Sequence, residues 1–396
     1  MASTGQLMTE LCTALQKDFD ITCIAAQPGY TGEIDKSKKL YEIDFLENIK
    51  VIRVKLPKVN KSSKISRIKY IIMYFFLALY ALLKEKNTDV IYTISQPPIL
   101  GGLIGTIGKF LKRAKHVYNI QDFNPEQANA VNYTGSKIVS NVAISVDKMN
   151  CKFSDQVIVV GHDMVQTLQK RFKKNRIHGY SVINNWIDEN TVIPLSKDTD
   201  EIAQFKEKYN LTDKFIVMYS GNIGLFYDLE NIITVAKHYK ENQDIVFVFI
   251  GEGAVKSSMQ QYVKEHDLCN VLFLPYQPKE YIKYSLNAAD IHLVVNQKGI
   301  KGVSVPSKIY GVMAAGKPIV GVLELGSEAE RLITDSQCGI IVEPQNYEGI
   351  IESIKYFYQM NKKELDSIGY NGRVYLEKNL KKETSIRKYR DLLQSI

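Results

Sequence analysis

Short runs of β-branched and aromatic residues alternate with segments of helical periodicity in both halves of the chain. In the first half, these runs predict strands at residues 21–26, 51–56, 89–94, 116–120, 156–160 and 180–183. In the second half, they predict strands at residues 215–220, 246–250, 271–274, 291–295, 319–323 and 339–342. Strands that alternate with helices are typical of parallel sheets built from βαβ units, so the pattern predicts an α/β protein.

The chain has 396 residues, which is too long for one ordinary hydrophobic core. We expect two Rossmann-like, doubly wound domains, over residues 1–190 and 191–375, and a helix over residues 376–396 that packs back on the first domain. Two such domains facing each other across a cleft would place the carboxyl ends of their strands, and hence a ligand, at the interface.

The first predicted helix begins unusually early in the chain. Residues 3–15 have the pattern of a helix with a capping box, and only Met1 and Ala2 precede them. A doubly wound domain normally begins with a strand that lies in mid-sheet. The first strand of the first domain is therefore expected to be missing, and the strand ending at Ala26 or the one ending at Ile94 should have an unpaired edge.

The segment 301–318 is the most informative stretch of the second half. Ser304 is the expected N-cap of a helix, and Gly316 is its expected end. A helix that opens with Pro306-Ser307-Lys308 offers backbone N–H groups, a hydroxyl and an ammonium at its positive end. That arrangement binds a phosphate or a diphosphate. The alternative interpretation is a capped helix with a surface lysine.

Three further turns lie where a predicted strand ends and a helix begins, at residues 220–224, 251–253 and 274–278. The glycines of the first two turns allow a close approach to a ligand, and a flat ring could lie against Tyr276 in the third. Each turn also has a purely structural interpretation. Together with Pro306-Ser307-Lys308, the turns predict four strand ends that converge on one edge of a sheet.

Basic residues are concentrated before an apolar segment in the first half. The chain carries a net charge of +8, and between Glu47 and Glu85 it has nine basic residues and no acidic one. The fourteen apolar or aromatic residues at 70–83 are too few to span a bilayer, which needs about 20. This pattern predicts either a buried core helix or a helix on an anionic membrane surface. The expected membrane contacts are Lys58, Lys61, Lys64, Arg67, Tyr74 and Phe75. Nucleic acid is not expected, because the basic residues precede the aromatic ones and are not interleaved with them.

The chemistry of the chain is carried by few residue types. Five scattered cysteines without a Cys-x-x-Cys pair favour a reducing compartment and argue against a disulfide framework or a zinc site. No metal-ligand spacing is visible, so neither a metal nor a cofactor is expected. Asp122 and Glu126 lie at a predicted strand end, where either could accept a proton from a reacting hydroxyl. A helix cap or an ion pair is the alternative role for both.

Taken in order, these residues resemble the GT-B glycosyltransferases of family 4, in particular bacterial transferases of O-antigen and capsule synthesis such as the L-fucosamine transferases. The resemblance covers nearly the whole chain. It rests on Thr4-Gly5-Gln6, Asp122-Phe-Asn-Pro-Glu126, Ile183-Asn-Asn-Trp-Ile-Asp188, Gly221-Asn-Ile-Gly224, Gly251-Glu-Gly253 and Val305-Pro-Ser-Lys-Ile-Tyr310 with Met313-Ala-Ala-Gly316. It implies a GT-B fold, transfer with retention at the anomeric carbon and no metal requirement.

The resemblance also implies a set of donor-binding residues: Thr4, Gly5, Gly221, Asn222, Gly224, Gly251, Glu252, Gly253, Tyr276, Gln277, Pro306, Ser307 and Lys308. Two glutamates that many members of the family carry are replaced here by Val303 and Gly311. The arginine and lysine that usually follow the first glycine turn are absent from residues 221–230. The charge of a diphosphate is then expected to be met by Lys308 and its helix, with Thr4 and Gly5 from across the cleft.

The function that the resemblance implies is transfer of a sugar from a nucleotide-sugar, with UDP as the expected nucleotide, to a polyprenyl-diphosphate-linked saccharide at the inner face of the cell membrane. Two alternatives stay open. A nucleotide-sugar 2-epimerase shares the two-domain fold, and a catalytically silent GT-B scaffold protein would explain the missing glutamates.

Overall fold

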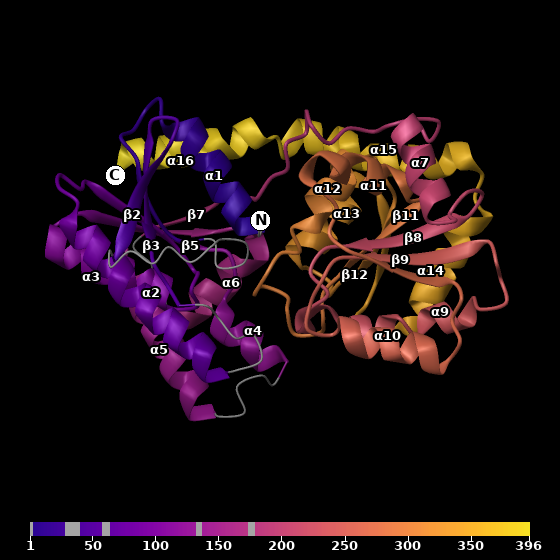
Figure 1. Ribbon diagram of the computed structural model, residues 1–396, viewed down its shortest axis with the longest axis horizontal. Helices are drawn as coiled ribbons and strands as arrows, with labels where there is room; N and C mark the ends of the chain where they lie inside the picture. The colour runs from indigo at the N-terminus through magenta and orange to yellow at the C-terminus, as the bar shows by residue number, and fades with distance from the viewer. Residues whose placement is uncertain (1–2, 28–39, 58–63, 132–136, 173–178) are drawn as a thin grey trace.

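The computed structural model describes residues 3–27, 40–57, 64–131, 137–172 and 179–396. Two halves, each built around parallel strands, lie side by side (Figure 1). All twelve predicted strands are present, with ends that differ by at most two residues from the prediction. One further strand, at Tyr41–Leu46, was not predicted.

The first half contains two sheets. Strands β4 (Val90–Ile94), β5 (Lys115–Ile120), β6 (Gln156–Val159) and β7 (Tyr180–Val182) are parallel and lie in that order. A smaller sheet has the order β1-β3-β2, with β1 at Thr22–Ala26, β2 at Tyr41–Leu46 and β3 at Ile49–Val54. Strand β1 is parallel to β3, whereas β2 is antiparallel to it.

The edges of β1 and β4 explain why the first half has two sheets. In the described part of the chain, β1 pairs with β3 alone and β4 pairs with β5 alone. The predicted unpaired edge is therefore confirmed, and it occurs on both strands. Helix α1 (Ser3–Leu15) covers one side of this region, because its leucines share a cluster with Ile21 and Val90. Helix α2 (Lys64–Lys84) covers the other side, where its side chains contact Ile24 and Ile91.

The second half is a single parallel sheet. Its strands are β8 (Phe215–Ser220), β9 (Ile245–Ile250), β10 (Val271–Leu274), β11 (Ile291–Val295), β12 (Ile319–Val322) and β13 (Gly339–Val342). Their order in the sheet is β10-β9-β8-β11-β12-β13. This order corresponds to 3-2-1-4-5-6, which places a ligand at the carboxyl ends of the strands where the winding reverses, between β8 and β11.

Helices cover both faces of the sheets. In the first half they are α1 (Ser3–Leu15), α2 (Lys64–Lys84), α3 (Leu100–Lys112), α4 (Asn124–Ala130), α5 (Lys137–Phe153) and α6 (His162–Arg171). In the second half they are α7 (Asp200–Lys208), α8 (Leu229–Ile232), α9 (Val235–His238), α10 (Lys256–Glu265), α11 (Ile282–Ala288), α12 (Lys308–Ala314), α13 (Glu328–Ser336), α14 (Tyr347–Gln359) and α15 (Lys362–Asn379), with short 3₁₀ turns η1 (Leu225–Tyr227) and η2 (Lys279–Tyr281).

The last helix, α16 (Lys382–Ser395), lies against the first half of the chain (Figure 1). Its residues Ile386, Tyr389 and Leu392 share one apolar cluster with the leucines of α1 and with β5 and β6. The amide Nδ2 of Asn119 on β5 donates to the hydroxyl of Tyr389 at 2.8 Å. Helix α16 therefore ties the end of the chain to its beginning.

The helix predicted after Ser304 begins three residues later than a Ser304 cap requires. Ser304 forms an isolated antiparallel bridge with Asp122, and α12 begins at Lys308 after Ser307. The amide of Phe123 also donates to the carbonyl oxygen of Val303 at 2.9 Å. The expectation that Ser304 caps this helix is wrong, because the backbone at 303–304 pairs with the first half of the chain instead.

Candidate functional site

The predicted glycine turns meet at the carboxyl ends of β8, β9 and β10. The amide of Gly221 donates to the carbonyl of Ile250 at 2.9 Å, and the amide of Gly251 donates to that of Leu274 at 2.9 Å. The hydroxyl of Tyr276 donates to the carbonyl of Glu252 at 3.4 Å. Three of the four turns singled out in the sequence therefore form one continuous edge.

The glycines of this edge are needed for its close backbone packing. A Cβ atom on Gly251 would lie 1.9 Å from the carbonyl oxygen of Gly221, and one on Gly253 would lie 2.0 Å from that of Ile223. Gly251 also has a φ of +145°, which L-residues rarely adopt. These glycines therefore have a structural role, and backbone atoms rather than side chains line this edge of the sheet.

Lys308 brings the fourth turn to the same place. Its Nζ lies 4.5 Å from the ring centre of Tyr219 and 4.0 Å from that of Tyr227. A Cβ on Gly221 would lie 3.2 Å from Cε of Lys308, so the lysine stands directly beside the first glycine turn. Burial lowers the pKa of Lys308 to about 7, and among the described residues no carboxylate pairs with it. A desolvated ammonium that contacts aromatic faces, and that has no carboxylate partner in the described part of the chain, is suited to bind an external anion.

Two residues beside Lys308 had no signal in the sequence. Tyr219 is buried at the end of β8, and its hydroxyl donates to the carbonyl of Asn222 at 2.6 Å. Tyr227 follows in η1, and burial raises its pKa, with a further contribution from the nearby Asp122. Both residues read as ordinary apolar positions of a strand and a turn, so only the fold places them around the lysine.

The remaining donor-side predictions lie near this edge in more exposed positions. The carboxylate of Glu252 pairs with Lys256 at 2.7 Å, and Nζ of Lys256 also donates to the carbonyl of Gly251 at 2.9 Å. The side chain of Gln277 donates to the carbonyl of Pro275 at 2.9 Å. Lys256 is a second ammonium at the edge that the sequence analysis missed. Its position, four residues after Glu252 at the start of a helix, was the available signal.

The smaller donor-side residues shape the backbone. Gly224 precedes η1 in extended conformation, and the carbonyl of Pro306 accepts from the amide of Ile309 at 3.1 Å. Ser307 is exposed and directly precedes α12. Because α12 has only seven residues, Lys308 itself carries more of the expected positive charge than the helix end does.

The predicted donor-binding residues of the first half lie at the start of helix α1. Thr4 and Gly5 lie in the first turn of α1, where the hydroxyl of Thr4 accepts from Nε2 of Gln96 at 3.4 Å. Ser95, next to Gln96, accepts from the amide of Asp122 at 3.3 Å. The loop after β4 therefore joins Thr4, a predicted donor-binding residue, to the loop that carries Asp122.

Asp122 lies at the junction of the two halves. Its backbone forms the bridge with Ser304, four residues before Lys308, and its side chain is hydrogen-bonded to Ser304. Burial raises the pKa of Asp122, and the bond from Ser304 opposes that shift. Asp122 also raises the pKa of Tyr227, whose ring contacts the ammonium of Lys308, so the carboxylate and the ammonium both lie near Tyr227.

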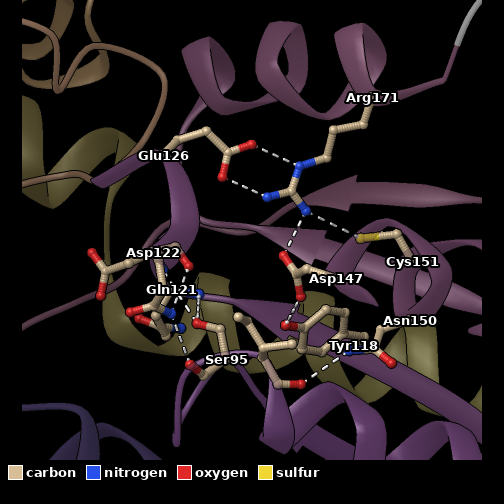
Figure 2. A network of polar contacts seen from close by, with 11 residues as sticks. Ser95, Tyr118, Gln121, Asp122, Glu126, Asp147, Asn150, Cys151 and Arg171 are labelled. Atoms are coloured by element: carbon tan, nitrogen blue, oxygen red, sulfur yellow. Dashed lines mark hydrogen bonds and ion pairs between the residues drawn. The ribbon is translucent and has the colours of Figure 1, made fainter. Parts of the chain in front are cut away.

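Glu126 has a different environment. Figure 2 shows its carboxylate joined to the guanidinium of Arg171, with contacts of 2.9 Å from Nε and 2.6 Å from Nη2. Nη1 of Arg171 reaches Asp147 at 2.5 Å, and the hydroxyl of Tyr118 donates to Asp147 at 2.6 Å. The carboxylate of Asp122 points away from this cluster in the same view. The structure thus separates the two predicted carboxylates and gives Glu126 the ion-pair role.

Reciprocal hydrogen bonds hold the two halves together beside the site. The carboxylate of Asp163 accepts from the amide of Gly302 at 2.9 Å. In the opposite direction, Glu328 accepts from the amide of His162 at 2.9 Å and from Nδ2 of Asn184 at 2.9 Å. Gly302 lies in the segment that leads to Lys308, so these contacts fix that segment against the first half.

The predicted membrane contacts fall into three groups. Lys58 and Lys61 lie outside the described residues, and Lys64 and Arg67 belong to the first turn of α2, where Arg67 is exposed. Tyr74 and Phe75 instead face inward. Tyr74 packs among core residues and burial raises its pKa to about 12, while Phe75 joins the cluster around Ile104. The prediction that Tyr74 and Phe75 contact a membrane is therefore wrong, because other residues occupy the outward positions of α2.

No set of ligands for a metal ion is evident among the described residues. Among the described residues, no three histidine, cysteine or carboxylate side chains come together in a group that could hold a metal ion. Histidines 116 and 292 are buried, and burial lowers the pKa of each to about 4. The candidate site is lined by the glycine turns, the ammonium of Lys308 and the rings of Tyr219 and Tyr227.

Comparisons with known proteins found a matching family model and two similar chains. Residues 201–375 match the family model of glycosyl transferases group 1. WbjE of Pseudomonas aeruginosa, named as a probable glycosyltransferase, is 27% identical over 342 residues, which cover 85% of this chain and 82% of that protein. WcaI of Escherichia coli, named as a colanic acid biosynthesis glycosyl transferase, is 25% identical over 70% of this chain and 67% of that protein.

Solved structures agree on the fold. Sucrose-phosphate synthase from Thermosynechococcus elongatus superposes with a TM-score of 0.77 at 17% identity, covering 100% of this chain and 94% of that chain. HepE from Anabaena, in complex with UDP and glucose, superposes with a TM-score of 0.68 at 14% identity, covering 88% and 87%. The predicted GT-B fold is thereby confirmed, and the matched family and named relatives support a glycosyltransferase.

Proposed function

We propose that this protein is a retaining glycosyltransferase that moves a sugar from a nucleotide-sugar to a lipid-linked acceptor in the synthesis of an O-antigen or capsule. The group 1 match spans every donor-side residue of the second half, from Gly221 to Lys308. The name of WcaI points to polysaccharide synthesis, and HepE was solved with UDP. UDP is therefore the nucleotide that we expect.

The observation that carries this proposal is the isolated charge of Lys308. The ammonium lies between Tyr219 and Tyr227, beside a glycine turn and without a carboxylate partner among the described residues. A nucleoside diphosphate would supply the missing negative charge, and its base could lie near Tyr276 on the neighbouring turn. Lys308 would then stabilise the charge that develops on the leaving diphosphate.

Asp122 is the carboxylate that we assign to the acceptor. The acceptor hydroxyl attacks the anomeric carbon, the bond from that carbon to the diphosphate breaks, and Asp122 accepts the hydroxyl proton. A carboxylate whose pKa is raised by burial is a better proton acceptor than an exposed one. Glu126 is less suited to this step, because Arg171 holds its carboxylate from two nitrogens.

We also propose that transfer needs no metal and that it takes place at the inner face of the cell membrane, on a polyprenyl-diphosphate-linked saccharide. Positive charge from Lys308 would replace the divalent cation that many sugar transferases use. A chelator is expected to leave the rate unchanged, and restoration of lost activity by a divalent ion would refute this part of the proposal.

The test is a screen of UDP- and GDP-sugars with a lipid-linked acceptor, with the products followed by mass spectrometry. A glycosyltransferase releases the nucleoside diphosphate only when the acceptor is present. A 2-epimerase instead converts the sugar without an acceptor, and a silent scaffold gives neither product nor a thermal shift with nucleotides. The anomeric configuration of the product, read by NMR, decides between retention and inversion.

Nucleotide affinity should depend on pH through Lys308. Bound diphosphate favours the protonated lysine, whereas the free protein loses this proton above a pKa of about 7. UDP binding therefore takes up a proton, and affinity should fall by up to about tenfold per pH unit above pH 7. Calorimetry in buffers of different ionisation enthalpy measures this uptake directly.

Lys308→Met should remove the pH dependence and weaken UDP binding by about 10- to 150-fold, which corresponds to a hydrogen bond of roughly 1.5–3 kcal/mol to a charged group. Met keeps the apolar packing between the two tyrosine rings. Lys301→Met, an exposed lysine of the same loop, is the matched control and should bind UDP normally. Equal affinities of the two variants would remove Lys308 from the site.

A further inference from the structure

Helix α2 has an apolar outer face that nothing in the described chain covers. Ile65, Ile68, Ile72, Phe76 and Tyr80 follow one another at intervals of three or four residues, and all are exposed. Ile65 is 79% exposed and Phe76 is 63% exposed. Residues at this spacing lie on one side of a helix, so the exposed residues form a continuous stripe.

The inner face of α2 shows that the helix stays on the domain. Ala78, Ala81 and Leu82 are buried against the β1-β3-β2 sheet, β4 and α3. By length and composition, Ile65–Lys84 could cross a membrane, and 17% of its most apolar window is buried in the protein. Crossing would expose the packed inner face to lipid and leave the two sheets uncovered. The helix is therefore suited to lie along a membrane surface.

Two neighbouring helices extend the apolar stripe sideways. Helix α3 lies between α2 and α5 and contacts both, and the three helices form one layer in Figure 1. Phe110 and Leu111 of α3 are 59% and 60% exposed, and Val142 of α5 is 58% exposed. The rings of Phe110 and Phe153 join α3 to α5, with centres 5.5 Å apart. We call the outer surface of α2, α3 and α5 the three-helix face.

The charge of these helices is almost entirely positive. Together, α2, α3 and α5 contain nine lysines and arginines and a single acidic residue, Asp147. Asp147 points inward, where it is 3% exposed and paired with Arg171. Lys109 is paired with Asp155, just beyond the end of α5, at 2.7 Å. The described part of the three-helix face otherwise presents apolar residues and basic charge without an exposed carboxylate from its own helices. This combination matches the acyl chains and headgroups of an anionic bilayer.

We propose that the three-helix face lies in the interface of an anionic membrane, with the apolar residues among the acyl chains and the basic residues at the headgroups. The proposal rests on the proposed function only for its lipid-linked acceptor, and it adds the surface by which the protein reaches that acceptor. A second copy of the chain is a poorer occupant, because two faces of the same positive charge repel each other. In this proposal, the exposed residues of α3 and α5 contribute to membrane binding as much as those of α2.

The test compares binding to vesicles of phosphatidylcholine alone with binding to vesicles that also contain phosphatidylglycerol. The full chain should sediment with the anionic vesicles, at least about tenfold more tightly than with the neutral ones, and added salt should weaken this binding. Phe76→Gln, Leu111→Gln and Val142→Gln, combined in one variant with one change on each helix, should lower the affinity by about tenfold or more.

A matched variant controls for the loss of exposed apolar side chains. Tyr356→Gln, Tyr370→Gln and Val374→Gln change three residues of similar exposure on α14 and α15 in the other half, and this variant should bind anionic vesicles like the unchanged chain. Thermal unfolding and UDP affinity should be unchanged in both variants. If the protein binds vesicles but does not bind UDP, the proposed function is wrong and the membrane role of the three-helix face still holds.

Two results would contradict the proposed membrane role of the three-helix face. One is a failure of the unchanged chain to bind anionic vesicles at moderate salt. The other is a dimer, detected by light scattering, that the triple variant dissociates, because the face would then be a contact between two copies. A variant with Arg67→Gln and Lys69→Gln should lose preference for anionic over neutral vesicles, and an unchanged preference would equally contradict the role given to charge.

Discussion

Asp122→Asn should slow sugar transfer by about 100- to 10,000-fold, the usual contribution of a positioned proton acceptor. Asparagine keeps the size of the side chain and can still bond Ser304, which is the contact that Asp122 makes in the structure. It cannot accept the proton of the attacking hydroxyl. Turnover should fall, and UDP affinity should stay near that of the unchanged protein, in steady-state kinetics combined with calorimetry.

Glu126→Gln is the comparison that separates the two carboxylates. It should cost stability, because it weakens the pair with Arg171, and the folded fraction should keep most of its turnover. The pH profile gives a second readout. Because burial raises the pKa of Asp122, the rate of the unchanged protein should fall on acidification at a higher pH than an exposed aspartate would give, and Asp122→Asn should flatten this limb. A larger loss of turnover in Glu126→Gln would reverse the assignment.

Arg171→Met should destabilise the protein by about 3–5 kcal/mol, the cost of breaking a buried ion pair by removing one partner. The guanidinium is 3% exposed and lies among Glu126, Asp147 and the ring of Phe123, whose centre is 4.4 Å away. Met fills much of the same space but leaves Asp147, also 3% exposed, without its cation. Urea unfolding followed by circular dichroism measures this loss.

Two further variants give this prediction its controls. Arg390→Met breaks a surface pair with Asp18 and should cost less than about 1 kcal/mol. Asp147→Asn, added to Arg171→Met, removes the uncompensated charge and keeps an acceptor for Tyr118, so it should recover part of the loss. If Arg171→Met unfolds at the same urea concentration as Arg390→Met, the buried network contributes nothing to stability.

The sequence predicted the strands well because most of them are buried on both faces. All five residues of β11 are buried, for example, and such strands are continuous apolar runs. Strand β2 was not predicted because Glu42 and Asp44 interrupt its apolar residues and its last four residues are exposed, so it forms no continuous apolar run. Its hairpin turn also has no glycine, and Glu47 takes a φ of 54° there instead.

The candidate site was predictable where it consists of local turns. The glycine turns and Pro306-Ser307-Lys308 are consecutive residues at strand ends, so pattern and spacing locate them. The partners of these turns are distant in sequence. Tyr219 and Tyr227 reach Lys308 from residues about eighty or ninety positions earlier, and Ser304 is recruited by Asp122 from the other half. No periodicity records such contacts, which is why the helix start and the surroundings of the lysine were missed.

The two sheets of the first half have a consequence for how this domain opens. In the described residues, no backbone ladder joins β1 to β4, so side chains of α1 and α2 provide the link between the β1-β3-β2 sheet and the rest. A region held in this way can detach as a unit while the β4–β7 sheet stays folded. Amide hydrogen exchange should therefore be faster in β1, β2 and β3 than in β5 and β6. Lipid pressed against the outside of α2 would slow that exchange without touching any strand.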